Sequence, residues 1–213
     1  MATKKDERPS VQITAPNIRR VGVPIVGVSP YVQNRFSAKG REIMRATQEA
    51  GSASKKGKKR EPKDFQALYE AAKYHLPDAA HGIPAAAFRC ALISACRLCG
   101  FKMTIAKQAV FVVADGFDEE DGTPLVRITK GDPQYYETAV RNATGVVDLR
   151  ARAMWREGWE AVVTIEYDAD MFSAEDVVNL LSRAGAQVGV GEGRMASKGS
   201  GGMGWGVFQV QRG

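Results

Sequence analysis

The densest positive charge in the sequence lies between Gly51 and Lys63, in the segment GSASKKGKKREPK. Its basic side chains are Lys55, Lys56, Lys58, Lys59, Arg60 and Lys63, with no large apolar residue among them to anchor the segment. A run of this kind is typical of a mobile loop that gathers phosphates, with an affinity that falls as salt rises. The alternative is a solvated loop whose charge only keeps the protein soluble.

A second candidate segment lies near the C-terminus, where GVGEGRMASKGSGGMGWGVF runs from Gly189 to Phe208. Glycine allows positive φ angles and removes side chains, so a large partner can approach the backbone amides. Arg194 and Lys198 add positive charge to the same loop. We expect an extended anion such as a phosphate chain to bind there, with Gly191 and Gly193 in the left-handed region. The alternative is a flexible connection between two strands.

The remaining candidates for metal or acid–base chemistry are three cysteines and two histidines. Cys96 and Cys99 have the spacing of zinc ligands, but a structural zinc site usually needs four ligands. Free cysteines on an apolar helix pack as small hydrophobic residues. We therefore expect no metal and no cofactor. His81 is the one weak candidate for a catalytic acid or base, and its more common role would be that of a polar loop residue.

Length, composition and charge limit the possible classes of protein. The chain has 213 residues, 44% of them hydrophobic, and a formal net charge of +6. We expect a tail over residues 1–17 and a single domain over residues 18–213. The basic balance favours nucleic acid as the partner. No apolar run is long enough for a membrane span, the first residues do not form a secretion signal, and three cysteines do not suggest a disulfide framework, so we expect a cytoplasmic protein.

Hydrophobic periodicity predicts the elements that position these residues. We expect strands over residues 18–28, 109–117, 125–130 and 159–168, two short extended pieces around Gly145, and closing strands over 186–191 and 204–211. Helices are expected from Ser37 to about Ala50, after Asp64, from Pro84 to Leu98, and from Ser173 to Gly185. Acidic residues between two of the strands, at 115 and 118–121, indicate a hairpin tip. The order predicts an α+β fold: a ferredoxin-like antiparallel sheet with helices on one face, a basic loop insertion at 51–63 and a C-terminal glycine-rich loop.

Three segments of this layout resemble the RAMP superfamily, the RNA-binding proteins of CRISPR systems, and most of all the subunits that line the guide RNA. They are IVGVSPYVQNRFSAKG (Ile25 to Gly40), HGIPAAAFRCALISACR (His81 to Arg97), and the glycine-rich loop before the final strand. The second segment of that superfamily usually has glycine and serines where this chain has Ala85, Ala86 and Ala87, while Arg89 keeps the basic position.

The resemblance implies a set of residues that bind nucleic acid. Besides the two basic loops, it implies Arg89 and, from the first segment, Arg35, Lys39 and the aromatic ring of Tyr31. Trp205 is the second aromatic candidate, because a base stacked on an aromatic ring contributes about 1–3 kcal/mol.

The resemblance also implies a function: a non-catalytic protein that binds single-stranded nucleic acid, RNA or DNA, and assembles side by side along the strand or within a ribonucleoprotein complex. A phage-encoded relative with another role is a further possibility. Two alternatives stay open, a metal-independent endoribonuclease that uses His81 and a protein-interaction factor that mimics a CRISPR subunit. The scarcity of histidine argues against the nuclease, and the basic loop argues against a pure protein mimic.

Overall fold

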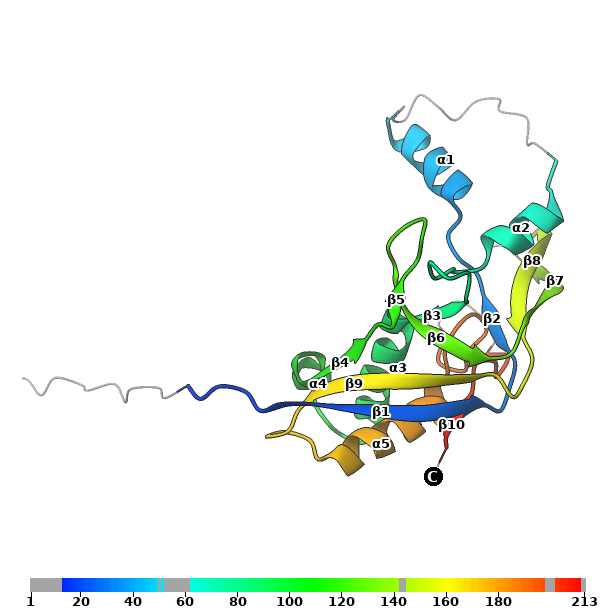
Figure 1. Ribbon diagram of the computed structural model, residues 1–213. Coiled ribbons are helices and arrows are strands. Elements are labelled where there is room, and N and C mark those ends of the chain that lie inside the picture. Colours follow the sequence, from blue (N-terminus) through cyan, green and yellow to red (C-terminus); the bar gives the residue numbers. More distant parts are fainter. Residues whose placement is uncertain (1–12, 50, 52–61, 142–144, 198–201, 212–213) are drawn as a thin grey trace, which may run out of the picture.

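Two long antiparallel strands form the centre of the fold. The computed structural model describes residues 13–49, 51, 62–141, 145–197 and 202–211 (Figure 1). Strand β1 (Ile18–Gly27) pairs with β9 (Glu160–Asp168) over almost its whole length. Both strands alternate β-branched and polar residues, as half-buried strands do, and the predictions for them are confirmed.

The sheet extends from both edges of this central pair. On the outer edge of β1 lies β10 (Phe208–Val210). The other edge of β9 is shared by β4 (Val110–Val113), which pairs with one half of it, and β6 (Pro124–Lys130), which pairs with the other. Strand β6 also pairs with β3 (Gly82–Pro84) and β5 (Gly116–Phe117). Every one of these pairings is antiparallel.

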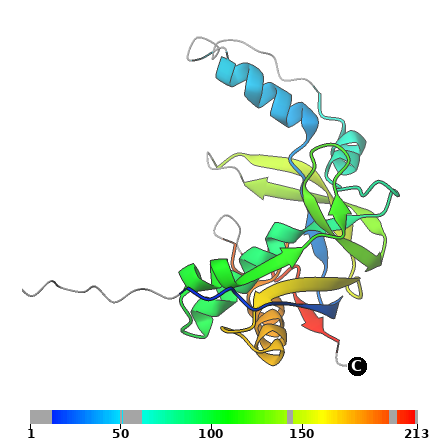
Figure 2. The same cartoon turned by 60° about the vertical axis from the view of Figure 1, so that its left-hand side comes forward.

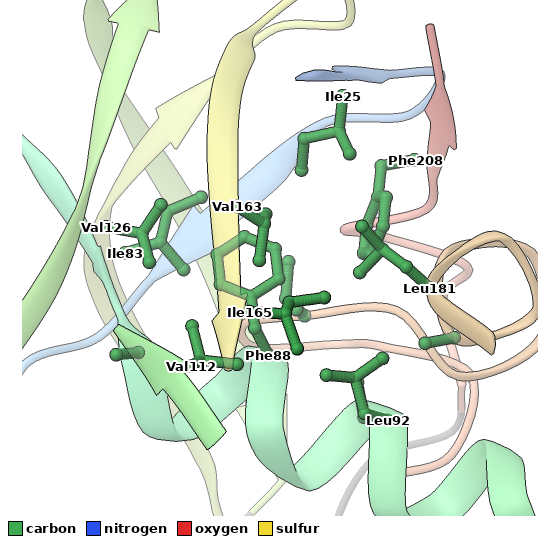
Figure 3. Close-up of a cluster of buried hydrophobic side chains, with 14 of the residues drawn as sticks. Ile25, Ile83, Phe88, Leu92, Val112, Val126, Val163, Ile165, Leu181 and Phe208 are labelled. Carbon is green, nitrogen blue, oxygen red and sulfur yellow. The ribbon is translucent and has the colours of Figure 1, made fainter. Parts of the chain in front are cut away.

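Helices α3 (Ala85–Leu98) and α5 (Ala174–Arg183) supply the hydrophobic core on one face of this sheet. Figure 3 shows Phe88 and Leu92 of α3 beside Val163 and Ile165 of β9. Positions two apart on a strand and three or four apart on a helix share one face. These side chains therefore all point into the space between α3 and the sheet, where they are buried. The core fixes α3, which carries one of the three resembling segments.

A smaller sheet lies beside the large one. Strand β8 (Val147–Trp155) pairs with β2 (Tyr31–Gln33) and with β7 (Pro133–Arg141). Helix α2 (Phe65–Ala71), capped by the Asp64 carboxylate, packs on this hairpin, and the Tyr69 hydroxyl donates to the Pro133 carbonyl at 2.9 Å. The extended pieces expected around Gly145 are thus one long hairpin.

Helix α1 (Ala38–Glu49) stands away from both sheets in two views of the molecule (Figures 1 and 2). It has no buried residue, and it begins where the Ser37 hydroxyl accepts from the Gly40 amide at 3.1 Å. The expected start at Ser37 is therefore confirmed.

Several sequence-based boundaries were wrong. The strand expected from residue 109 begins at Val110, and the residues before it form a short helix, α4 (Met103–Ala109), that the sequence analysis did not predict. Gly185 does not end α5, because the chain continues as a π-helical turn, η2 (Ala184–Val188). Residues 186–191 are consequently not a strand, and the glycine-rich loop connects this turn, rather than a strand, to β10.

The structure confirms the α+β class and the predominance of antiparallel pairing. Among the described residues, every helix is too short or too polar to cross a lipid bilayer.

Candidate nucleic-acid interface

A groove of about 490 Å³ is lined by residues from all three of the segments that resemble the RAMP superfamily (25–40, 81–97 and the glycine-rich loop). One wall is the chain from Tyr31 to Asn34, a second is the exposed side of α3, and the third is the glycine-rich loop from Gly189 to Arg194. These segments are far apart in the sequence and become neighbours because β2, α3 and the loop before β10 meet at one end of the sheet (Figure 1).

The α3 wall is smooth. It presents small side chains only, those of Ala86, Ala87, Cys90, Ala91 and Ser94. Pro84 precedes the helix, and no side chain among the described residues caps its first turn. The first amides of a helix carry partial positive charge and lack intrahelical acceptors. An extended ligand can therefore come close to this wall and find hydrogen-bond donors there.

The glycine-rich loop is held against the segment before and within β2. The Glu192 amide donates to the Val32 carbonyl at 2.9 Å, and the Gly206 amide donates to the Pro30 carbonyl at 2.7 Å. The Gly191 amide makes no backbone hydrogen bond with the described residues. The expectation that loop amides face a partner thus applies to part of the loop only, since others bind the protein itself.

Gly191 and Gly193 have positive φ angles of 82° and 72°. A Cβ atom at Gly191 would lie 2.6 Å from the Tyr31 ring, and one at Gly193 would lie 2.4 Å from the Trp205 ring. Both positions therefore require glycine for two reasons, the backbone angle and the lack of space. Their first role is to let the loop pack tightly at the groove.

Arg194 is the basic side chain of the loop that the structure places on the groove. Its guanidinium donates to the Gly191 carbonyl at 3.0 Å, which orients it across the loop, and the side chain stays partly exposed. The guanidinium has five donors, so most remain for an anion. Lys198, predicted to act with it, lies outside the described residues, as do Lys55, Lys56, Lys58, Lys59 and Arg60.

Trp205 lies under the loop rather than on an open surface. Its ring is half-buried, in edge contact with Tyr136 at 5.5 Å between centroids. The ring packs directly against Gly193. Trp205 is not one of the residues that line the groove, so its stacking on a base stays a prediction.

Tyr31 requires a correction. It is only 1% exposed, with its ring between Trp155 and Trp159 and its hydroxyl accepting from the Gln33 amide at 2.9 Å. Burial raises the pKa of the Tyr31 hydroxyl. A stacking platform needs an exposed ring face, so we withdraw Tyr31 as a base-stacking residue and assign it to the floor of the groove.

Arg35 also requires a correction. Its side chain is 1% exposed and lies 3.0 Å from an Asp118 carboxylate oxygen and 2.6 Å from one of Glu120. The hydrogen bond from Arg35 lowers the pKa of Glu120. An arginine already neutralised inside the protein has little to offer a phosphate, so we remove it from the interface. The acidic hairpin tip that the sequence indicated is its binding partner.

The other two basic candidates lie away from the groove lining. Arg89 points to the opposite side of α3, where its guanidinium donates to the carbonyls of Lys107 and Val110 at the end of α4. We therefore assign it to the fold, because cations at the C-terminal end of a helix stabilise it. Lys39 is exposed on α1 and is not part of the groove lining.

His81 lines a different depression, together with Lys130 and Asp132. Its ring lies 4.8 Å from that of His75 and 5.5 Å from that of Trp155, between centroids. Burial and the neighbouring His75 lower the pKa of His81. Its separation from the groove gives no support to a role in cleaving a strand bound there.

The cysteines do not converge. Cys96 is buried in the core, while Cys90 and Cys99 are exposed at different points of α3 and its end. Among the described residues, no three side chains of metal-ligating type come together.

Sequence reasoning missed the charged pair on the loop wall. The Arg152 guanidinium donates to the Glu192 carboxylate at 2.5 Å, joining β8 to the glycine-rich loop. It also missed Gln33, whose buried amide donates to the Gly82 carbonyl at 2.8 Å and accepts from the Tyr74 amide at 3.0 Å. An acid between two glycines, in GEGR, was the one available signal for Glu192.

No protein-family model matches this chain, and a search of curated proteins likewise gives no match. The groove and its residues are therefore the basis for inferring the function.

Proposed function

We propose that this protein binds single-stranded nucleic acid, in the first place RNA, without cleaving it, and that the strand lies in the groove between β2, α3 and the glycine-rich loop. The observation that carries the proposal is the meeting of the three resembling segments in that one groove. Their meeting supports a common binding surface for the three segments.

The chemistry of the groove supports a phosphate backbone as the ligand. Arg194 supplies a guanidinium, the start of α3 supplies uncapped amides, and small side chains leave room for close approach. The net charge of +6 favours a polyanion over a neutral ligand. The groove offers few side chains that could distinguish bases, which favours binding through the backbone.

We further propose a ferredoxin-like core and a relationship to the RAMP superfamily. The order of elements β1, α3, β4, β9, α5, β10, together with the spatial strand order β10-β1-β9-β4, supports the first. In that interpretation, α1, α2 and the β7–β8 hairpin belong to insertions. A cytoplasmic location and assembly along the strand complete the proposal.

Self-association is supported by apolar side chains on the two projecting elements. Ile43 and Met44 on α1 are exposed, as are Val147 and Leu149 on β8. Exposed apolar side chains grouped on projecting elements often mark protein–protein contacts. A strand could thus bring several copies together.

The experiment that tests the proposal is purification without nuclease treatment, followed by sequencing of the co-purified nucleic acid and titration of the stripped protein with a labelled 15-nucleotide oligo(U). We expect bound single-stranded RNA and a submicromolar to micromolar affinity at low salt that weakens steeply with salt, on the order of what several phosphate contacts give. The proposal is contradicted if no nucleic acid co-purifies and the stripped protein does not bind the oligonucleotide at low salt.

A further inference from the structure

Glu192 is the only acid among the described residues that line the groove. Its side chain is 28% exposed, and the Arg152 guanidinium holds one of its carboxylate oxygens, Oε2, at 2.5 Å. The backbone is fixed as well, since the Glu192 amide donates to Val32 and both flanking glycines adopt positive φ angles. The carboxylate is therefore fixed at the groove wall from both ends.

The second carboxylate oxygen, Oε1, has no donor among the described residues. A carboxylate is an acceptor only, with room for several hydrogen bonds on its two oxygens. In a groove that attracts phosphates, a free acceptor repels the phosphates themselves and attracts only the donors of the ligand. A nucleic-acid strand has two kinds of donor, the ribose 2′-hydroxyl and the amino groups of some bases.

The 2′-hydroxyl fits this position better than a base does. It occurs at every nucleotide of RNA, whereas amino groups are absent from uracil, and the groove is lined by backbone and small side chains rather than by base-reading groups. The 2′-hydroxyl is also the group that distinguishes RNA from DNA at a given site. An acidic side chain takes the same role towards a ribose in dinucleotide-binding folds.

We propose that Glu192 accepts a hydrogen bond from a ribose 2′-hydroxyl and so makes the groove prefer RNA to DNA. The inference rests on the proposed function, because it presupposes a strand in this groove. Arg194 then meets the phosphate and Glu192 meets the sugar, from positions two residues apart on the same loop. Arg152 orients the carboxylate and partly offsets its repulsion of the phosphates.

Glu192 also neutralises Arg152, which is only 7% exposed. Neutralising this buried arginine would by itself be a sufficient reason for the ion pair. The two roles differ in what they predict. A carboxylate that only neutralises Arg152 affects RNA and DNA binding equally, whereas one that reads the sugar affects the ratio of the two affinities. The ratio is therefore the quantity to measure.

The test compares oligo(U) with oligo(dU) of 15 nucleotides, because these differ only in the 2′-hydroxyl. We expect the wild-type protein to bind oligo(U) about tenfold more tightly, as suits a hydrogen bond to a charged group. A 2′-fluoro oligo(U), which cannot donate, should bind like oligo(dU). In Glu192→Gln, oligo(dU) should bind more tightly than to wild type, since a negative charge leaves the groove, and the RNA-to-DNA ratio should fall several-fold.

Glu160→Gln serves as the matched control, because Glu160 pairs with Lys130 on the large sheet, outside the groove lining. Its RNA-to-DNA ratio should equal that of wild type. A second variant, Glu192→Ala, removes the acceptor entirely, and thermal unfolding of each variant shows whether Arg152 still has an adequate partner. The ratio should fall towards one in this variant as well.

The outcomes separate the inference from the proposed function. Wild-type protein that binds both oligonucleotides equally, or a folded Glu192→Ala variant that keeps the wild-type ratio, overturns the role of Glu192 and leaves strand binding intact. Wild-type protein that binds neither oligonucleotide overturns both.

Discussion

Arg35, just before α1, binds the turn after β5. Its guanidinium lies within ion-pair distance of the carboxylates of Asp118, Glu120 and Asp121. Asp118, whose side chain is 1% exposed, also accepts from the backbone amides of His75, Glu120 and Asp121. The arginine and these three amides together stabilise the negative charge of a buried carboxylate. The cluster therefore acts as one unit, and removing the arginine leaves a buried negative charge.

We predict that Arg35→Ala lowers the free energy of unfolding by about 3–5 kcal/mol, the usual cost of removing one partner of a buried ion pair. Urea denaturation at neutral pH measures it. The matched control is Arg20→Ala, because Arg20 pairs with Glu166 on an exposed part of the sheet, and exposed pairs contribute below about 1 kcal/mol. Equal losses in the two variants would show that Arg35 is no more than a surface charge.

His81 gives stability a pH dependence. Burial, with a smaller effect from His75, lowers its pKa in the folded protein below the value near 6.5 that histidine has in an unfolded chain. Between the two values the unfolded chain binds more protons, so stability falls as the pH falls below about 6.5 and is constant well above it. Unfolding free energies measured from pH 8 to pH 5 should show this decline, and His81→Gln should reduce it. If the unfolding free energy of His81→Gln depends on pH as that of wild type does, groups other than His81 cause the decline.

At the residue scale, sequence reasoning recognised charge but not its burial. Arg35 and Arg194 are both arginines in resembling segments, yet one is enclosed by carboxylates and the other lines the groove. The partners of Arg35 lie 83 or more residues away in the chain. Only the folded arrangement reveals which arginine has been neutralised. The same holds for Tyr31, which the sequence could not place between two tryptophans.

Among the elements, α3 contributes to both the core and the groove. Phe88 and Leu92 face the sheet, while Ala86 and Cys90 face the groove. Because the helix period separates these two faces, the exposed Ala86 and Cys90 can change without disturbing the core, whereas Ala91 lines the groove and is also buried in the core.

We predict that Ala86→Glu weakens binding of oligo(U) and lowers the slope of log affinity against log salt by about one, since a new carboxylate cancels about one phosphate contact. Ala86 is exposed, so stability should change by less than about 0.5 kcal/mol. Leu98→Glu is the control, because Leu98 is exposed at the far end of the same helix and outside the groove lining. If both variants bind alike, α3 does not line the binding site. Fluorescence anisotropy measures both.

The elements differ in how far local sequence predicts them. Strands β1 and β9 and the capping box of α5 were predictable because alternation and Ser173 with Asp176 are local signals. The short helix α4 was not, because its seven residues, MTIAKQA, are too few to show a clear helical period. The sequence predicts a helix end at Gly185, but this residue lies inside a π-helical turn where a Cβ atom would come 2.2 Å from the Phe208 carbonyl oxygen. Close contact with β10, not the end of the helix, accounts for glycine there.

At the scale of the whole molecule, we predict assembly along a strand. With the described α1 and β7–β8 hairpin projecting from the body (Figure 2), several copies should bind one long oligonucleotide next to one another. Mass photometry with and without a 60-nucleotide oligo(U) should show monomers or small species alone and a ladder of multiple copies with the strand. One copy per long strand at saturating protein would contradict side-by-side assembly.

A nucleic-acid strand could be held in the groove or, instead, by the general positive charge of the chain. A chain with a net charge of +6 attracts polyanions wherever its cations lie. The place of binding can be tested with two variants, each of which removes one positive charge from a different part of the surface. Arg194 lines the groove, and Arg20 lies on the exposed part of the sheet.

The measurement is the affinity for a labelled oligo(U) at two salt concentrations for wild type, Arg194→Ala and Arg20→Ala. We predict that Arg194→Ala binds several-fold more weakly, with a salt slope smaller by about one, while Arg20→Ala stays within about twofold of wild type. Equal losses in the two variants would mean that the strand is held by diffuse charge, and the groove would then not be the binding site.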